Sequence, residues 1–319
     1  MLISVIVAAY NREKYIADTL KSIQDQTFKD FECLIVDDNS TDSTVNIILE
    51  QFCKKDKRFK LYVNCTDNSK KHVNDKYAVD VLFNLPESKY TVHIDSDDIF
   101  DRNMISRLVD EMERHPEYDA CCADIAVLRH TKDLLIDLNY LEKNAPVPAD
   151  SITRGHDART WEDEQFNVSP GYIYAMNCRM WNNQCYIAKT SMLKHLAALN
   201  YFENIPYGDY IFWCNAIAEG YRLHKIKDIL CYYRISGSNT SNNEKWCVKE
   251  LQTLYIYNYS RTRMILHSYH NGGFAKINII PGSVIPWYIE RTNSLKKELI
   301  EKNEWDLIPD RYKEELVFN

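Results

Sequence analysis

Short apolar runs alternate with segments of helical spacing over the first third of the chain, and this alternation constrains the fold most strongly. The runs cover residues 2–10, 31–36, 59–64 and 90–94. Continuous β-branched runs of this length are typical of strands that are buried on both faces. Strands that alternate with helices form βαβ units, so the sequence predicts an α/β fold with a mostly parallel sheet.

The segments between the runs carry the apolar stripes of amphipathic helices. The first segment places Ile16, Leu20 and Ile23 one turn apart, with Asn11 as the expected N-cap. The other expected helices cover residues 44–55 (with a stripe of Val45, Ile48, Leu49 and Phe52), 74–85 and 102–115. These helices would cover the faces of the sheet.

Polar residues follow three of the four runs at the points where the strands end. Tyr10 and Asn11 follow the first run, Asp37 and Asp38 the second, and the sequence "DSDD" of residues 95–98 the fourth. In open parallel sheets, ligands bind beyond the carboxyl ends of the strands. We therefore expect the three polar clusters to meet at one edge of the sheet and to form a binding site.

The last of these clusters crowds the carboxylates of Asp95, Asp97 and Asp98 into four positions. Like charges this close raise one another's pKa, so the cluster costs stability unless a positive group lies beside it. Residues i and i+2 of an extended segment point the same way, which lets Asp95 and Asp97 present oxygens to one cation. Mg²⁺ or Mn²⁺ suits such oxygens, and a solvated turn is the alternative.

The pattern loosens after residue 118. Strands are expected over residues 118–128 and 222–235, a strand followed by a helix over 182–199, a helix over 208–220, and helices within 244–319. Between about 140 and 170 the chain makes a long excursion that contains several prolines. Loops of this length are usually functional.

Composition argues against several other classes of protein. The 319 residues carry a net charge of −7, which does not indicate a nucleic-acid-binding surface. The ten cysteines form no CxxC pair, which argues against common zinc and thioredoxin-type motifs and favours reduced cytosolic thiols. No apolar run reaches the length of a membrane span, and the first run lacks a basic segment before it, so a soluble, cytoplasmic chain is expected.

Three other motif families fit less well. In haloacid-dehalogenase-type phosphatases the acidic motif follows the first strand, whereas three strands precede Asp95 here. An EF-hand loop that began at Asp95 would place Ile99, Phe100 and Ser106 where an oxygen ligand, Gly and Glu are needed. No GxGxxG follows the first run, which excludes a Rossmann dehydrogenase.

Taken in order along the chain, four blocks resemble the family 2 glycosyltransferases, which are inverting enzymes of the GT-A fold. The blocks are residues 4–44, "VHIDSDD" (92–98), "YGDYIFW" (207–213) and "YYRISGSNTS" (232–241). The resemblance covers roughly residues 2–240. It implies a nucleotide-sugar-binding half (1–118), an acceptor and catalytic half of the same GT-A domain (119–240) and a C-terminal helical region (241–319).

The resemblance implies a metal-dependent transfer of a sugar, with inversion, from a nucleotide donor to a hydroxyl of a glycan or lipid-linked saccharide. A UDP-sugar donor and a role in cell-surface polysaccharide synthesis are expected. Asp97 or Asp98 would bind Mn²⁺ or Mg²⁺ directly, and Asp95 would contact the ribose or orient the ligand. A GT-A-like protein that binds a nucleotide sugar without turning it over stays open as the alternative.

Further residues match positions around the donor in this family. The loop that packs on the nucleotide corresponds to Ala9, Tyr10, Asn11 and Arg12. Asp38 matches the acid that accepts a hydrogen bond from uracil, although it could instead cap a helix. Lys71 and Arg234 are expected near the diphosphate. Ser236 stands where the family frequently has His, so a metal ligand from that loop is in doubt.

Asp209 matches the catalytic base, although Gly208 replaces the Glu that often precedes it; capping the helix is the alternative role. Trp161 and Trp181, in and just after the excursion, are expected to contact the acceptor or else to anchor the loop. A lipid-linked acceptor would bring the protein to the inner face of the membrane as a peripheral partner. The C-terminal helices could also join two copies into a homo-oligomer.

Overall fold

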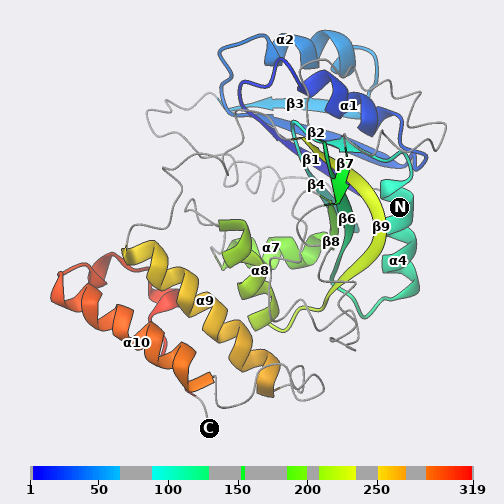
Figure 1. The fold of residues 1–319 in the computed structure, drawn as a ribbon. Helices are drawn as coiled ribbons and strands as arrows, with labels where there is room; N and C mark the ends of the chain where they lie inside the picture. Colours follow the sequence, from blue (N-terminus) through cyan, green and yellow to red (C-terminus); the bar gives the residue numbers. More distant parts are fainter. Residues whose placement is uncertain are drawn as a thin grey trace. The chain divides into compact units, whose positions relative to one another are not determined.

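The computed structural model describes residues 3–64, 88–128, 152–154, 185–199, 208–234, 251–270 and 285–317 (Figure 1). The chain forms two compact units, each assembled from separate stretches of sequence. The first comprises Met1–Glu162, Trp181–Ala198 and His224–Gly237, and the second Asp163–Met180, Leu199–Leu223 and Ser238–Asn319. The expected helix over residues 74–85 lies outside the described residues.

A single sheet organises the first unit, and in the described part of the chain it has nine strands. They are β1 (Ile3–Ala9), β2 (Phe31–Asp37), β3 (Phe59–Val63), β4 (Tyr90–Asp95), β5 (Ile99–Phe100), β6 (Ala120–Leu128), β7 (Ile152–Arg154), β8 (Tyr186–Lys189) and β9 (Leu223–Arg234). The strand order is β3-β2-β1-β4-β8-β6-β9-β5, and β7 pairs with β6. The four predicted apolar runs are confirmed as β1 to β4.

The order of the parallel strands reverses at β1. The chain proceeds from β1 to β2 and β3 on one side and then returns to place β4 on the other side of β1. Ala9 pairs with Asp37, and Ala8 pairs with Asp95, so the carboxyl ends of three strands are level. A crevice beyond such a reversal is where ligands bind in open α/β sheets.

Beyond β4 the sheet is antiparallel. β4 pairs antiparallel with β8, β8 with β6, and β5 with β9. The prediction of a parallel sheet therefore holds for the first four strands, and the sheet continues in the opposite sense after them. The architecture is a mostly parallel central sheet flanked by helices.

In the described residues, the first unit contains the helices α1 (Ile16–Gln24), α2 (Thr44–Ile48), α4 (Met104–Arg114) and α7 (Thr190–Ala198). Ile16, Leu20 and Ile23 of α1 are fully buried as predicted, in one core with the apolar face of β1, β2 and β4. Helix α2 continues as a π-helical turn, Leu49–Cys53. The predicted stripe is wrong at Leu49, which is 38% exposed.

The second unit is helical in the part that the structure describes. It contains α8 (Gly208–Ala218), α9 (Leu251–His270), α10 (Ile285–Glu301) and short 3₁₀ turns at Trp305–Leu307 and Asp310–Tyr312. Arg263 of α9 donates to Glu219 just beyond α8 (2.7 Å), and buried Asn215 donates to Ser260 (3.3 Å). The expected C-terminal helical region is confirmed. Among the described helices, none has both the length and the apolar character needed to cross a bilayer.

Candidate active site

The loop after β1 turns sharply at Asn11, whose φ of +51° lies in the left-handed region that Asn tolerates better than most residues. Its backbone N–H donates to Oγ of Ser40, and its Oδ1 accepts from the backbone N–H of Thr41 (2.8 Å). The prediction of Asn11 as a helix N-cap is therefore wrong. Helix α1 begins at Ile16, after Tyr15, because the Asn11 side chain is engaged by the neighbouring loop.

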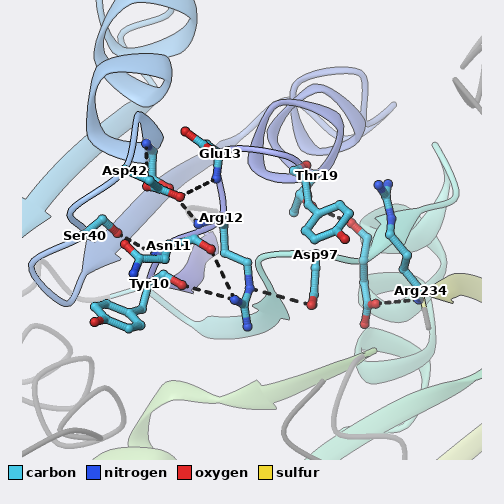
Figure 2. A network of polar contacts seen from close by, with 12 residues as sticks. Tyr10, Asn11, Arg12, Glu13, Thr19, Ser40, Asp42, Asp97 and Arg234 are labelled. Carbon is cyan, nitrogen blue, oxygen red and sulfur yellow. Dashed lines mark hydrogen bonds and ion pairs between the residues drawn. The ribbon is translucent and has the colours of Figure 1, made fainter. Parts of the chain in front are cut away.

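Further contacts join this loop to the loop after β2, as Figure 2 shows. The backbone N–H of Arg12 donates to Oγ1 of Thr44 (2.7 Å), and that of Glu13 to Asp42 (3.2 Å). The Glu13 carboxylate in turn accepts from the backbone N–H of Ser43 (3.1 Å). The two loops are thus fastened together at the carboxyl edge of the sheet.

The two acids after β2 have different surroundings. Asp37 is fully buried and accepts from both the N–H and the hydroxyl of Ser40; burial raises its pKa, and those bonds act against the rise. Asp38 is largely buried, and its Oδ1 accepts from Nδ2 of Asn64 (3.0 Å), the residue after β3. Asp37 therefore builds the turn, while Asn64 fixes the orientation of the Asp38 carboxylate.

The acidic turn after β4 buries two of its three carboxylates. Asp98 is fully buried: its Oδ1 accepts from the backbone N–H of Arg234 (2.9 Å), and its Oδ2 has no hydrogen-bond partner among the described residues. Burial, with Asp95 and Asp97 nearby, raises the pKa of Asp98 well above its usual value. The pKa of Asp97, which is 7% exposed, is also raised by burial, and Arg12 and Arg234 oppose that rise.

Arg234, at the end of β9, is held by helix α1. Its guanidinium donates to the Asp18 carboxylate (3.1 Å) and lies over the ring of Tyr15, 5.0 Å from the centroid. Thr19 of the same helix donates to the carbonyl of Asp98 (2.8 Å). Helix α1 and strand β9 therefore clamp the acidic turn from two sides.

Arg12 reaches the same turn from the loop after β1 (Figure 2). Its Nε lies 3.7 Å from Oδ2 of Asp97, and its Nη1 donates to the carbonyls of Tyr10 (3.2 Å) and Asn11 (3.4 Å). The Nε group makes no hydrogen bond to any described residue. The contact between Arg12 and Asp97 is one of charge.

The acidic turn fits a divalent cation that completes its shell with other ligands. Carboxylate oxygens suit Mg²⁺ and Mn²⁺, and the buried Oδ2 of Asp98 has no hydrogen-bond partner among the described residues. No three His, Cys, Asp or Glu side chains in the described residues are grouped as a complete metal site. A cation here would need oxygens from water or from a bound phosphate as well.

Comparisons with known proteins show to which family the chain belongs. The family model "Glycosyl transferase family 2" matches residues 4–202. The chain belongs to glycosyltransferase family 2. It is therefore a glycosyltransferase, and inversion at the anomeric carbon is typical of this family.

Among the relatives of this glycosyltransferase is an Escherichia coli protein described as "UDP-Glc:alpha-D-GlcNAc-diphosphoundecaprenol beta-1,3-glucosyltransferase WfaP". It is 25% identical over 255 residues, which cover 79% of this chain and 85% of the relative. The S. aureus TarS 1–349 structure in complex with UDP-GlcNAc is 19% identical, with a TM-score of 0.59, over 98% of this chain and 83% of the TarS 1–349 chain.

A third similar protein is the mannosyltransferase PcManGT from Pyrobaculum calidifontis, solved with GDP-Man and Mn²⁺. It has a TM-score of 0.52 and 15% identity over 94% of this chain and 75% of that one. These structural likenesses confirm the GT-A fold that the sequence predicted.

The structure brings most of the predicted site residues of the glycosyltransferase together in the first unit. They are Ala9, Tyr10, Asn11, Arg12, Asp38, Asp95, Asp97, Asp98 and Arg234. Lys71, Trp161 and Trp181 lie outside the described residues. Asp209 is the second residue of α8, in the second unit, and its side chain is also outside the described part.

Sequence reasoning missed four residues that shape this site. Asn64 orients Asp38, while Tyr15, Asp18 and Thr19 hold Arg234 and the acidic turn. Asn64 had a readable signal, because it is a polar residue at the carboxyl end of a strand, like the others. Tyr15, Asp18 and Thr19 had none, since their role depends on contacts with distant segments.

Proposed function

We propose that this glycosyltransferase moves a sugar from a UDP-linked donor to a hydroxyl of a glycan or lipid-linked saccharide, in cell-surface polysaccharide synthesis. One observation carries the proposal: the fixed carboxylates of Asp38 and Asp97 lie at the ends of β2 and β4, on either side of the loop from Tyr10 to Arg12. The similar proteins WfaP, a UDP-Glc glucosyltransferase, and TarS, solved with UDP-GlcNAc, support a uridine donor.

In this proposal Asp38 recognises the base. A carboxylate accepts the ring N–H of uracil, and cytosine lacks that proton at neutral pH. Asn64 donates to one oxygen of Asp38 and so sets the direction of the other. Tyr10, which is 37% exposed, provides a ring beside this position for packing on the nucleotide.

Asp97 would hold Mn²⁺ or Mg²⁺ in the donor complex. Asp95 would contact the ribose or orient the ligand. Between the two acids considered for the metal, Asp97 is favoured because Asp98 is fully buried and already accepts the Arg234 N–H. The cation would neutralise charge on the departing nucleoside diphosphate. Its presence beside GDP-Man in PcManGT supports this dependence.

Asp209 would act as the general base that takes the proton of the acceptor hydroxyl. Inversion by direct displacement needs one carboxylate on the face of the sugar opposite the leaving group. An acid in the first turn of a helix is stabilised in its ionised form by the helix dipole. Arg234, Lys71 and the two tryptophans Trp161 and Trp181 keep their proposed roles at the diphosphate and the acceptor.

A donor panel tests the proposal. UDP-sugars, GDP-mannose and CDP should be compared by thermal shift with and without Mn²⁺, followed by transfer assays with labelled donors. UDP-sugars should raise the Tm only with Mn²⁺, and Asp97→Asn should lose that shift while its ligand-free Tm is kept. A preference for GDP donors, or an unaltered shift in the variant, would contradict the assignment. Binding without any transfer would favour the inactive nucleotide-sugar-binding protein.

A further inference from the structure

Two arginine side chains, those of Arg12 and Arg234, lie beside the acidic turn and differ in how firmly they are held. Arg234 is 5% exposed in its side chain and is fixed by Asp18, Tyr15 and the backbone bond to Asp98. The Arg12 side chain is 22% exposed and meets Asp97 across 3.7 Å without a hydrogen bond from Nε. Of the two side chains, that of Arg12 can move away from Asp97 more easily.

A divalent cation at Asp97 would meet Arg12 at close range. Two positive groups on one carboxylate repel each other, and the repulsion is strong where the surroundings are largely buried. Asp97 is 10% exposed in its side chain, so water screens this repulsion poorly. Arg12 and the cation therefore compete for the Asp97 carboxylate.

Once displaced, Arg12 has an anionic partner available in the donor. A diphosphate that shares a cation with Asp97 lies near the same turn. The planar guanidinium of arginine suits phosphate oxygens and can bind two of them at once. The backbone of Arg12 stays anchored through its N–H to Thr44, so only the side chain needs to turn.

We propose that Arg12 is an internal counter-ion of the acidic turn, held by Asp97 until a divalent cation and a nucleoside diphosphate together replace that contact. This inference rests on the proposed use of a nucleotide donor and a metal. Arg12 then couples the two ligands. The nucleotide draws Arg12 away from Asp97 and so tightens cation binding, and by linkage the cation tightens nucleotide binding equally.

Titration of Mn²⁺ followed by electron paramagnetic resonance tests the exchange directly. Wild type, Arg12→Gln and Arg12→Lys should each be titrated without nucleotide and with saturating UDP. Lys54→Gln provides the control, because Lys54 is an exposed cation of the same unit that pairs with Glu50. The midpoint of urea unfolding should be recorded for all four proteins.

Without nucleotide, Arg12→Gln should bind Mn²⁺ roughly two- to fivefold more tightly than wild type, the range expected for removing one weak ion pair. UDP should tighten Mn²⁺ binding by wild type, and this effect should be smaller in Arg12→Gln. Arg12→Lys should match wild type for Mn²⁺ alone and lose part of the UDP effect, because its ammonium lacks the planar fork. Lys54→Gln should follow wild type throughout.

Two results would overturn the inference. Equal or weaker Mn²⁺ binding by Arg12→Gln without nucleotide would mean that Arg12 does not compete for Asp97, and it would leave the proposed function intact. No Mn²⁺ binding by wild type, even with UDP, would overturn the exchange together with the metal dependence of the proposed function. If Arg12 had only a structural role, Arg12→Gln would bind Mn²⁺ more weakly both without and with UDP.

Discussion

The backbone N–H of Arg234 donates a hydrogen bond of 2.9 Å to Oδ1 of Asp98, and so joins two residues that are 136 positions apart. Asp98 is fully buried, and burial together with the nearby acids raises its pKa well above the usual value. The contact needs an acceptor oxygen at this position but not a negative charge.

Asp98→Asn and Asp98→Ala should therefore differ in stability. The amide keeps an acceptor for the Arg234 N–H, so its free energy of unfolding should exceed that of the alanine variant. The alanine leaves the N–H unsatisfied and should cost about 1–3 kcal/mol. Urea unfolding measures both, and equal destabilisation by the two substitutions would contradict this account.

Nucleotide choice should depend on Asp38 and on its partner Asn64. Asp38→Ala should weaken UDP binding by about 1–3 kcal/mol, the range for a hydrogen bond to a charged group. Asn64→Ala should produce a smaller loss in the same direction, since it removes one hydrogen bond that orients the carboxylate. Calorimetry with UDP and CDP checks both variants. If wild type binds CDP as tightly as UDP, Asp38 does not select the base.

Asp209→Asn should lower kcat by roughly 100-fold or more while UDP binding is unchanged, if Asp209 is the general base. A capping role alone would cost about 1 kcal/mol of stability and spare activity. Glu219→Gln is a matched control on the second unit, because Glu219 pairs with Arg263 and should affect stability more than turnover. Near-normal turnover in Asp209→Asn would remove it from the mechanism.

A pH effect is expected at His224, which stacks on Tyr118 with ring centroids 4.4 Å apart. Burial lowers the pKa of His224, although Glu111 acts in the opposite direction. Between that lowered value and about 6.5, the unfolded chain binds more protons than the native one, so stability falls as the pH falls.

His224→Phe keeps the ring stack and removes the titrating group. Its free energy of unfolding should therefore fall less than that of wild type between pH 7.5 and pH 5.5. An identical pH dependence for His224→Phe and wild type would contradict the burial effect.

The parallel half of the fold could be predicted because its signals are local. Each apolar run marks a strand, and the polar residues that follow the runs mark the edge where Asp38, Asp97 and Arg12 meet. In the antiparallel half the strands β6, β8 and β9 were expected, but their pairing could not be predicted, since no local pattern in β8 indicates that its partners are β4 and β6.

Within the site, one prediction was wrong and another was incomplete, and the two cases share one cause. Asn11 has the side chain of a helix cap, yet the loop after β2 engages it. Arg234 matched a family position near the diphosphate, and the structure adds that Asp18 and Tyr15 hold its guanidinium. In both cases a contact between distant segments outweighs the local preference of the residue, and such contacts have no signature in a single sequence.

The pairing of β5 with β9 has a consequence for how the chain is made. Ile99 pairs with Tyr232, so β5, which directly follows the acidic turn, has no partner strand among the described residues until β9 is synthesised. At roughly 5–20 residues per second, the 136 residues between Asp98 and Arg234 take about 7–27 s to emerge. For that time the nascent chain holds an uncovered strand edge beside clustered carboxylates. The candidate site is thus complete only after Arg234 has been synthesised, although the rest of its residues lie within the first 98 of the chain.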